Sequence, residues 1–141
     1  MKILKFGGTS VGTPECFIKV KAIAGSQTEP VIIVVSAMSG VTDELIQIAR
    51  LASVRDSSFR DLLKALRIRH YDVCDEVVRN SADLFNLKSE IDSLLRNLES
   101  ICEGVYLLQI LPERTLEEIE SFGERLSSLI VTAVIPNAIR Y

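Results

Sequence analysis

The stretch Lys5–Val11, KFGGTSV, holds residue types suited to phosphate chemistry. The paired glycines Gly7 and Gly8 allow the backbone to approach a ligand closely and to turn its N–H groups toward it. A lysine beside such a turn can neutralise the charge of a phosphoryl group during transfer. A solvated Lys5 next to an ordinary glycine turn fits the same spacing. Because GxxxxGK[ST] and GxGxxG are both absent, a P-loop enzyme and a simple dinucleotide-binding oxidoreductase are unsupported.

Two further stretches offer groups that could hold a small polar substrate. SAMSGVTD supplies the hydroxyls of Ser36 and Thr42 directly after a predicted strand, which is where open α/β sheets place ligands. SFGERLSS places Gly123 inside a helical pattern at a cost of about 1 kcal/mol relative to alanine, which predicts close approach by another element. Glu124 beside it is either a solvated carboxylate or a ligand for a substrate ammonium group. The alternative to substrate binding by residues 36–43, SAMSGVTD, is an ordinary loop that ends in a helix cap.

Few other residues are candidates for catalysis or metal binding. His70 is the single histidine, so a triad or a histidine metal cluster is not expected, and we predict a surface position on a helix. Cys16, Cys74 and Cys102 show no metal-binding spacing and no even number for disulfides. Each lies among apolar positions of a predicted helix, which favours buried, reduced thiols. No metal site is predicted.

The composition is that of one globular domain. Hydrophobic residues make up 48% and charged residues 25%, which excludes a disordered tail. Lys and Arg number 16 against 19 Asp and Glu, so the net charge is −3 and a nucleic-acid partner is not expected. The longest apolar runs are too short to span a membrane, and the first six residues are too weakly apolar for a signal peptide. We therefore expect a cytoplasmic protein.

The elements that must position these residues begin with a strand–helix–strand unit. Residues 2–6 are predicted to form a short strand, and a helix follows that is capped by Thr13 and opened by Pro14. The β-branched run at 31–35, VIIVV, predicts a parallel strand that is covered on both faces. The next helix is expected to begin with Thr42 as its cap.

Helices dominate the rest of the chain. Residues 54–105 lack proline and carry apolar residues at three- and four-residue spacing, which predicts a helical hairpin broken near 80–86. The hairpin serves either packing or a subunit contact. A capping box of Thr115 and Glu118 predicts the start of a last helix, which Pro136 ends. The fold class is therefore α/β, a parallel sheet with surrounding helices.

Together, the three stretches resemble the ordered motifs of the aspartate kinases, members of the amino-acid kinase family. KFGGTS resembles that family's N-terminal strand and loop. VSA and GVT, within residues 35–42, resemble the second motif, and SFGE with LS, within 121–127, resembles the third. Three motifs in order are much more specific than any one, whereas residues 54–105 match in helical character only. The resemblance implies the N-terminal half of an amino-acid kinase fold.

The resemblance implies a role for each residue of the first motif. Lys5 would contact the ATP phosphates and stabilise charge in the transition state, which makes it the candidate catalytic residue. Gly7 and Gly8 would supply backbone that faces the phosphates, with Thr9 and Ser10 nearby. Mg²⁺ would accompany ATP, with most of its ligands expected outside these 141 residues.

The other two motifs would bind the acceptor. Ser36 and Thr42 would hold L-aspartate by its carboxylate groups, and Glu124 would accept a hydrogen bond from its amino group. The implied reaction transfers a phosphoryl group from ATP to the side-chain carboxylate of L-aspartate. Its product, 4-phospho-L-aspartate, begins lysine, threonine and methionine biosynthesis. Positioning and charge neutralisation dominate this kind of transfer.

Aspartate kinases are much longer than this chain, which therefore resembles a fragment. Residues 1–141 would form the N-terminal, substrate-binding part of the kinase domain, without the ATP-binding half or the regulatory domains. Residues 138–141 are predicted to begin a further strand. Some motif details are similar to kinases fused to homoserine dehydrogenase. We expect the fragment to be inactive alone, which turnover of ATP and aspartate would contradict. The missing strands would leave an open sheet edge, so we also expect self-association as a homo-oligomer, or marginal stability of the fragment.

Two alternatives stay open. Another enzyme with the amino-acid kinase fold, acting on glutamate, carbamate or UMP, would begin with a similar strand–helix–strand unit. The loop from Ser36 to Thr42 and the carboxylate of Glu124 favour aspartate. A non-catalytic assembly domain would instead use the 54–105 hairpin as a dimer surface. Sedimentation over a concentration series discriminates, since a monomer at every concentration counts against assembly.

Overall fold

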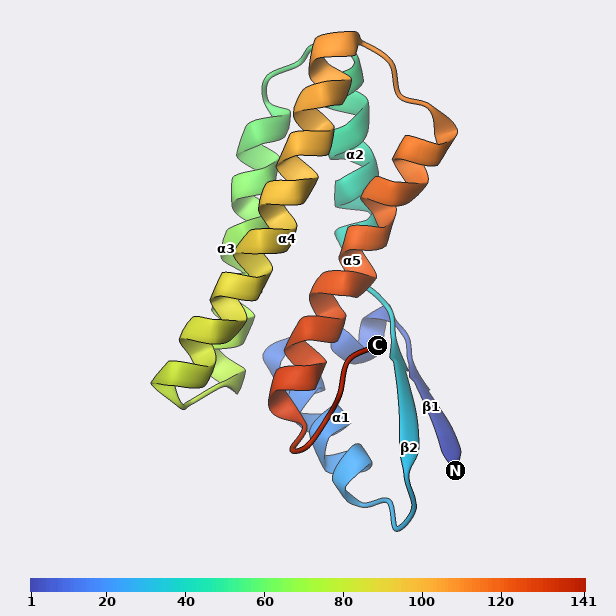
Figure 1. The fold of residues 1–141 in the computed structure, drawn as a ribbon, viewed down its shortest axis with the longest axis vertical. Coiled ribbons are helices and arrows are strands. Elements are labelled where there is room, and N and C mark those ends of the chain that lie inside the picture. Colours follow the sequence, from blue (N-terminus) through green and yellow to red (C-terminus); the bar gives the residue numbers. More distant parts are fainter.

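In the computed structural model, which describes all 141 residues, four long helices stand side by side above a two-stranded sheet and a shorter helix (Figure 1). The elements in chain order are β1 (Lys2–Phe6), the 3-10 helix η1 (Gly8–Val11), α1 (Pro14–Gly25), β2 (Val31–Val35), α2 (Val41–Ser53), α3 (Phe59–Val77), α4 (Ser81–Leu108) and α5 (Glu113–Val134). The predicted α/β class is confirmed. None of the helices is both long and apolar enough to cross a membrane.

The predicted strand–helix–strand unit is confirmed in β1, α1 and β2. The two strands are parallel, in a register that runs from the pair Lys2–Val31 to the pair Phe6–Val35. Thr13 caps α1 as predicted, because its hydroxyl accepts the backbone N–H three residues later at 3.4 Å. This cap fixes the turn between the strand and the helix, and so the direction in which the chain leaves β1.

The expectation that the strand at 31–35 is covered on both faces is wrong. Alternate residues of a strand point to opposite faces, and only one face of this sheet packs against the core. The other face exposes Ile3, Ile32 and Val34, whose exposed fractions are 70%, 48% and 45%. In the register of the sheet, Lys5 is paired with Val34 and lies on this same open face. The open face is therefore apolar along its length and carries a lysine near its carboxyl end.

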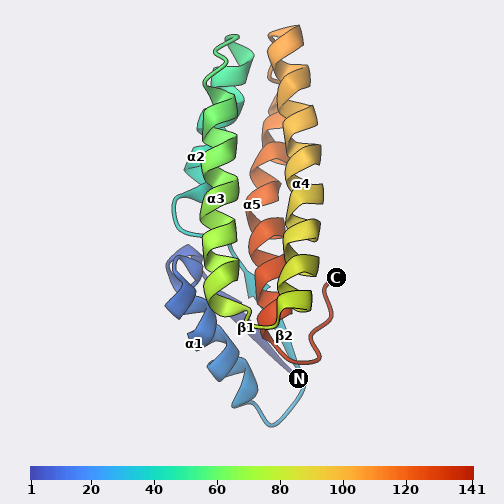
Figure 2. The same cartoon turned by 90° about the vertical axis from the view of Figure 1, so that its left-hand side faces the viewer.

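Helices α2 to α5 form a bundle with one continuous apolar core (Figure 2). The predicted hairpin is confirmed as α3 and α4, but its break is earlier and shorter than 80–86. Helix α3 ends at Val77, and Val78 after it is extended. Helix α4 begins at Ser81, because the side chain of Asn80 accepts hydrogen bonds from the free N–H groups of Ala82 and Asp83, both at 3.0 Å.

Thr42 and Thr115, unlike Thr13, do not cap the helices for which they were predicted as caps. Helix α2 begins at Val41, so Thr42 lies inside its first turn, and no side chain caps it. Helix α5 begins at Glu113 after Pro112, so Thr115 also lies inside the first turn and forms no capping box. In both cases the preceding backbone, a tight turn or a proline, already sets the start of the helix.

Other expectations for single residues are also wrong. His70 is fully buried in α3, because the helical period places it on the apolar stripe of Leu66 and Val73. The last residues, 138–141, form no strand. Burial is confirmed for Cys74 and Cys102, and it raises the pKa of both thiols to about 12, so they stay protonated.

Candidate functional site

The carboxyl ends of β1 and β2 bring the glycine turn and the serine-containing loop together. The N–H of Ser36 donates to the carbonyl of Phe6 at 3.0 Å and extends the parallel pairing beyond the strands. A Cβ added to Gly8 would lie 3.2 Å from the carbonyl oxygen of Ala37. A glycine at this position therefore permits the two segments to approach closely.

The two glycines after β1 have different surroundings. A Cβ on Gly7 would meet no other atom within 4 Å, whereas Gly8 packs against the loop after β2. The carbonyl of Gly7 accepts the N–H of Ser10 at 2.9 Å, and this bond closes the turn that contains Thr9. Space beside the Gly7 backbone is open to solvent, while Gly8 fixes the turn to its neighbour. Lys5 is exposed just before this turn.

The loop after β2 ends in a tight turn. The N–H of Val41 donates to the carbonyl of Met38 at 3.0 Å, and Gly40 has φ 82° and ψ −12°. These angles are those of the third residue of a type II turn, which glycine adopts without strain. The turn leads straight into α2, so the half-buried Ser36 and Thr42 flank it on the strand side and the helix side.

Helix α5 brings the third stretch to the same place. A Cβ on Gly123 would lie 2.7 Å from the Cβ of Ala37 and 3.5 Å from a methyl carbon of Val41. The close approach predicted at this glycine is therefore confirmed, and its partner is the loop after β2. Glu124 follows the contact directly and is exposed. The sequence folds three motifs that are far apart in the chain onto one end of the sheet.

The candidate polar side chains from the three motifs have no partners within the chain. The side chains of Lys5, Ser36, Thr42 and Glu124 form no hydrogen bond and no ion pair. In the bundle, by contrast, the half-buried Arg60 and Glu103 pair through two hydrogen bonds of 2.6 and 2.8 Å. The candidate side chains are thus free to bind a ligand. Their individual roles stay predictions.

Two residues at this end of the sheet were not identified from the sequence. Arg69 of α3 donates to the carbonyl of Ser39 at 2.6 Å, although 30 positions separate them and no local pattern links them. Cys16 is only partly buried, so the prediction of a buried thiol is wrong for it, because its sulfur lies at the start of α1, 3.5 Å from the carbonyl of Thr9. A hydrogen bond from the Thr13 hydroxyl, at 3.2 Å, lowers the pKa of this thiol.

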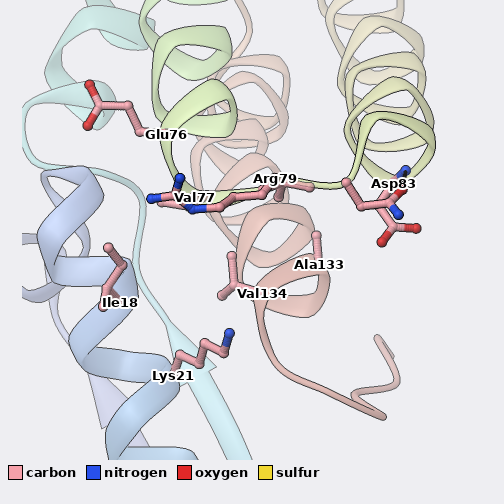
Figure 3. Close-up of a pocket in the computed structure, with 10 residues that line it drawn as sticks. Ile18, Lys21, Glu76, Val77, Arg79, Asp83, Ala133 and Val134 are labelled. Carbon is pink, nitrogen blue, oxygen red and sulfur yellow. Dashed lines mark hydrogen bonds between the residues drawn. The ribbon is translucent and has the colours of Figure 1, made fainter.

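A hollow lies away from the carboxyl ends of the strands, and the sequence did not indicate it. It has a volume of about 440 Å³ and is bounded by α1, by the turn between α3 and α4 and by the end of α5 (Figure 3). Lys21 and Arg79 bring positive charge to it, and Glu76 and Asp83 bring negative charge. The charges balance, so the hollow favours no class of charged ligand. No group of three or more His, Cys, Asp or Glu side chains in the chain is placed to hold a metal ion.

A model of the amino acid kinase family matches residues 1–138. The chain therefore belongs to the amino acid kinase family. Its relatives within that family are aspartokinases. It is 28% identical to the chloroplastic bifunctional aspartokinase/homoserine dehydrogenase 2 of Zea mays, over 93% of this chain and 14% of the relative. It is 33% identical to the aspartokinase of Candida albicans, over 94% of this chain and 25% of the relative.

Solved structures show the same arrangement of elements. Aspartokinase III of E. coli, in complex with lysine and aspartate, matches with a TM-score of 0.82 at 24% identity, which shows the fold. The same enzyme in complex with aspartate and ADP matches with a TM-score of 0.79 at 26% identity. Each match covers 95% of this chain and 28% of the other. The chain thus has the fold of one part of an aspartokinase and spans between 14% and 28% of the length of these relatives.

Proposed function

We propose that the chain is the aspartate-binding part of an aspartate kinase, the enzyme that phosphorylates the side-chain carboxylate of L-aspartate with ATP. The observation that carries the proposal is the meeting of three motif segments at one end of the sheet, through Gly8 and Gly123, which both pack against the loop after β2. The aspartokinases among its relatives support the choice of substrate. The full activity belongs to a longer enzyme, in which residues 1–141 form the N-terminal part of the kinase domain.

On the ATP side, the proposal assigns charge neutralisation to Lys5 and close backbone approach to Gly7 and Gly8. The exposed backbone of Gly7 leaves room for a phosphate, and the turn that contains Thr9 and Ser10 would lie beside it. An ammonium group near the γ-phosphate stabilises the negative charge that spreads over its oxygens during transfer. The binding of ADP by the E. coli enzyme supports a nucleotide at such a site.

On the acceptor side, the hydroxyls of Ser36 and Thr42 would donate to carboxylate oxygens of aspartate, and Glu124 would accept from its ammonium group. A side-chain carboxylate oxygen of aspartate then attacks the γ-phosphorus. The bond from that phosphorus to the oxygen it shares with the β-phosphate breaks, and ADP leaves with the electron pair. Holding the acceptor in line with this bond is the main contribution of the three side chains.

Magnesium, which neutralises phosphate charge when bound, is not assigned ligands in this chain. No cluster of acidic side chains in the chain fits a divalent ion. The candidate residues at the carboxyl ends of the strands carry hydroxyl groups, one ammonium group and one carboxylate. Most of the ligands of the metal are therefore expected to lie outside these residues.

Self-association and a cytoplasmic location remain part of the proposal. The large apolar side chains of Ile68 on α3 and Phe85 on α4 are exposed, which supports a subunit contact on the hairpin. Sedimentation over a concentration series tests this, and a monomer throughout contradicts it. For the location, the Zea mays relative is a chloroplastic enzyme, so imaging of a tagged copy is the direct test.

A calorimetric titration with L-aspartate, L-glutamate and UMP tests the substrate. The proposal predicts that L-aspartate binds most tightly and that Glu124→Gln weakens it about tenfold, since a hydrogen bond to a charged group contributes roughly 1.5–3 kcal/mol. Glu117→Gln is the matched control, because Glu117 is exposed on the same helix and forms no ion pair. Preference for glutamate or UMP would assign another family member. Equal effects of the two variants would remove Glu124 from the site.

A further inference from the structure

Arg69 ties helix α3 to the loop that follows β2. Its Nη2 donates to the carbonyl oxygen of Ser39 at 2.6 Å, and its Nη1 lies 3.3 Å from Oε1 of Glu44 in α2. The guanidinium therefore holds the turn and the first part of α2 at the same time. A planar fork with several donors suits this bridging position, and a single ammonium group does not.

The part of α3 that carries Arg69 is packed into the bundle. Leu66 and His70, on either side of Arg69 in α3, are fully buried, and the imidazole Nδ1 of His70 lies 2.8 Å from the carbonyl of Leu66. Helix α3 also packs along α2. The side chain of Arg69 thus starts from a fixed point of the bundle, and its own exposed fraction is only 30%. Its hydrogen bond therefore ties the loop to the bundle.

The carbonyl that Arg69 holds belongs to the peptide at the centre of the turn. In a type II turn, which the angles of Gly40 define here, this peptide is rotated by about half a turn relative to a type I turn. The peptide is planar and trans, so its carbonyl and its N–H point in opposite directions. Holding the Ser39 carbonyl toward α3 therefore aims the Gly40 N–H away from α3. That N–H has no acceptor within the chain.

We propose that Arg69 is a positioning residue for aspartate binding: by holding the Ser39–Gly40 peptide, it sets the loop that carries Ser36 and the first turn of α2, in which Thr42 lies. This inference rests on the proposed function above. Arg69 itself touches no substrate. The loop ends in a turn whose residues, Ser39 and Gly40, are exposed. Glycine gives this turn additional backbone conformational freedom, which the hydrogen bond from the Arg69 guanidinium restricts.

The test uses Arg69→Met, with Arg67→Met as the matched control. Arg67 lies on the same helix, is similarly exposed and pairs with Asp92 at 3.1 Å, away from the loop. Two quantities are measured for each variant: amide hydrogen exchange of residues 39–42 without ligand, and the Kd for L-aspartate. We expect Arg69→Met to speed exchange at these amides and to weaken binding about tenfold, the effect of losing one charged hydrogen bond. Arg67→Met should change neither.

Arg69→Lys keeps the charge and the aliphatic stem, and it is the variant to use if the methionine variant does not fold. It should speed exchange in the turn at an unchanged melting temperature. Equal exchange and equal Kd for the Arg69 and Arg67 variants would overturn the proposal. Faster exchange in the turn together with no aspartate binding by the unmodified chain would instead count against the proposed function and leave the turn restraint in place.

Discussion

The helical bundle and the sheet of this chain bury their apolar side chains to very different extents. In α4, residues such as Leu98 and Cys102 are fully buried. The helix lies between α3 and α5 in the bundle, and these helices cover its apolar side chains (Figure 1). In β2, every residue is apolar, yet Ile32 and Val34 are about half exposed. The difference arises because the bundle encloses its own core, whereas only one face of the sheet is covered.

This difference explains where the candidate site lies. The site forms where the end of the sheet meets the bundle, a boundary that we call the seam. There the loop after β2 packs against the turn after β1 on one side, and it contacts Gly123 of α5 and Arg69 of α3 on the bundle side. The bundle supplies rigidity, and the open end of the sheet supplies unpartnered polar groups. Stability and ligand binding should therefore respond to mutation in different regions, and four sets of substitutions test where the stability lies.

The largest effect is expected from a cavity in the bundle. Leu98→Ala should destabilise the chain by about 2–5 kcal/mol, because a fully buried leucine leaves an empty volume. Ile32→Ala on the open sheet face should cost less than about 1 kcal/mol. Urea unfolding of both variants measures the difference. Comparable losses would mean that the sheet face is covered in solution, for example by self-association.

A second substitution tests the seam. Gly123→Ala should destabilise the chain by about 1–3 kcal/mol, because the added methyl would lie 2.7 Å from the Cβ of Ala37. Ala37→Gly in the same chain should restore most of that loss, since it removes the opposing atom. A double-mutant cycle by thermal unfolding gives the coupling. Additive effects would show that α5 and the loop are not in contact.

The buried histidine predicts a dependence on pH. Burial lowers the pKa of His70 below its ordinary value of 6.5, so the folded chain keeps it neutral where the unfolded chain binds a proton. Stability should therefore fall as the pH drops below about 6.5, by at most about 1.4 kcal/mol per pH unit. In His70→Leu this part of the slope should vanish. Urea midpoints at pH 7 and pH 5 provide the comparison, and parallel slopes would mean that the imidazole is solvated.

The smallest expected loss of stability comes from removing a helix cap, which Asn80 provides for α4 and Thr115 does not provide for α5. Asn80→Ala should cost about 1 kcal/mol, because the side chain satisfies two N–H groups at the start of α4. Thr115→Ala should change stability by less than about 0.5 kcal/mol, because Thr115 lies inside α5 and caps nothing. Thermal unfolding resolves the two. A larger loss for Thr115 would restore the capping box that the sequence indicated.

The sequence was most informative where local chemistry decides the structure. The strand–helix–strand unit followed from Thr13, Pro14 and the β-branched run at 31–35: Thr13 and Pro14 start the helix, and the run forms a strand, although only one of its faces is covered. The close approach at Gly123 followed from the cost of a glycine inside a helix, and the packing of Ala37 against it supplies the reason. Motif order alone identified the family that matches residues 1–138.

What the sequence missed depends on contacts between distant segments. A threonine before an apolar run looks like a cap, but at Thr42 the preceding type II turn already starts the helix one residue earlier. His70 is a polar residue, so residue type suggested the surface, whereas its position on the stripe of Leu66 buries it. The bond from Arg69 to Ser39 spans 30 residues, and no pattern in either segment predicts it.

The most direct measurement is a map of amide chemical shifts in the chain on addition of L-aspartate, with D-aspartate as the control. We expect stereospecific shifts confined to the seam, at Ser36, Gly40, Thr42 and Glu124, with the outer faces of α3 and α4 unchanged. Shifts centred on the hollow beside Lys21 and Arg79, or no shifts at all, would contradict the claim that the end of the sheet forms an aspartate site within these residues.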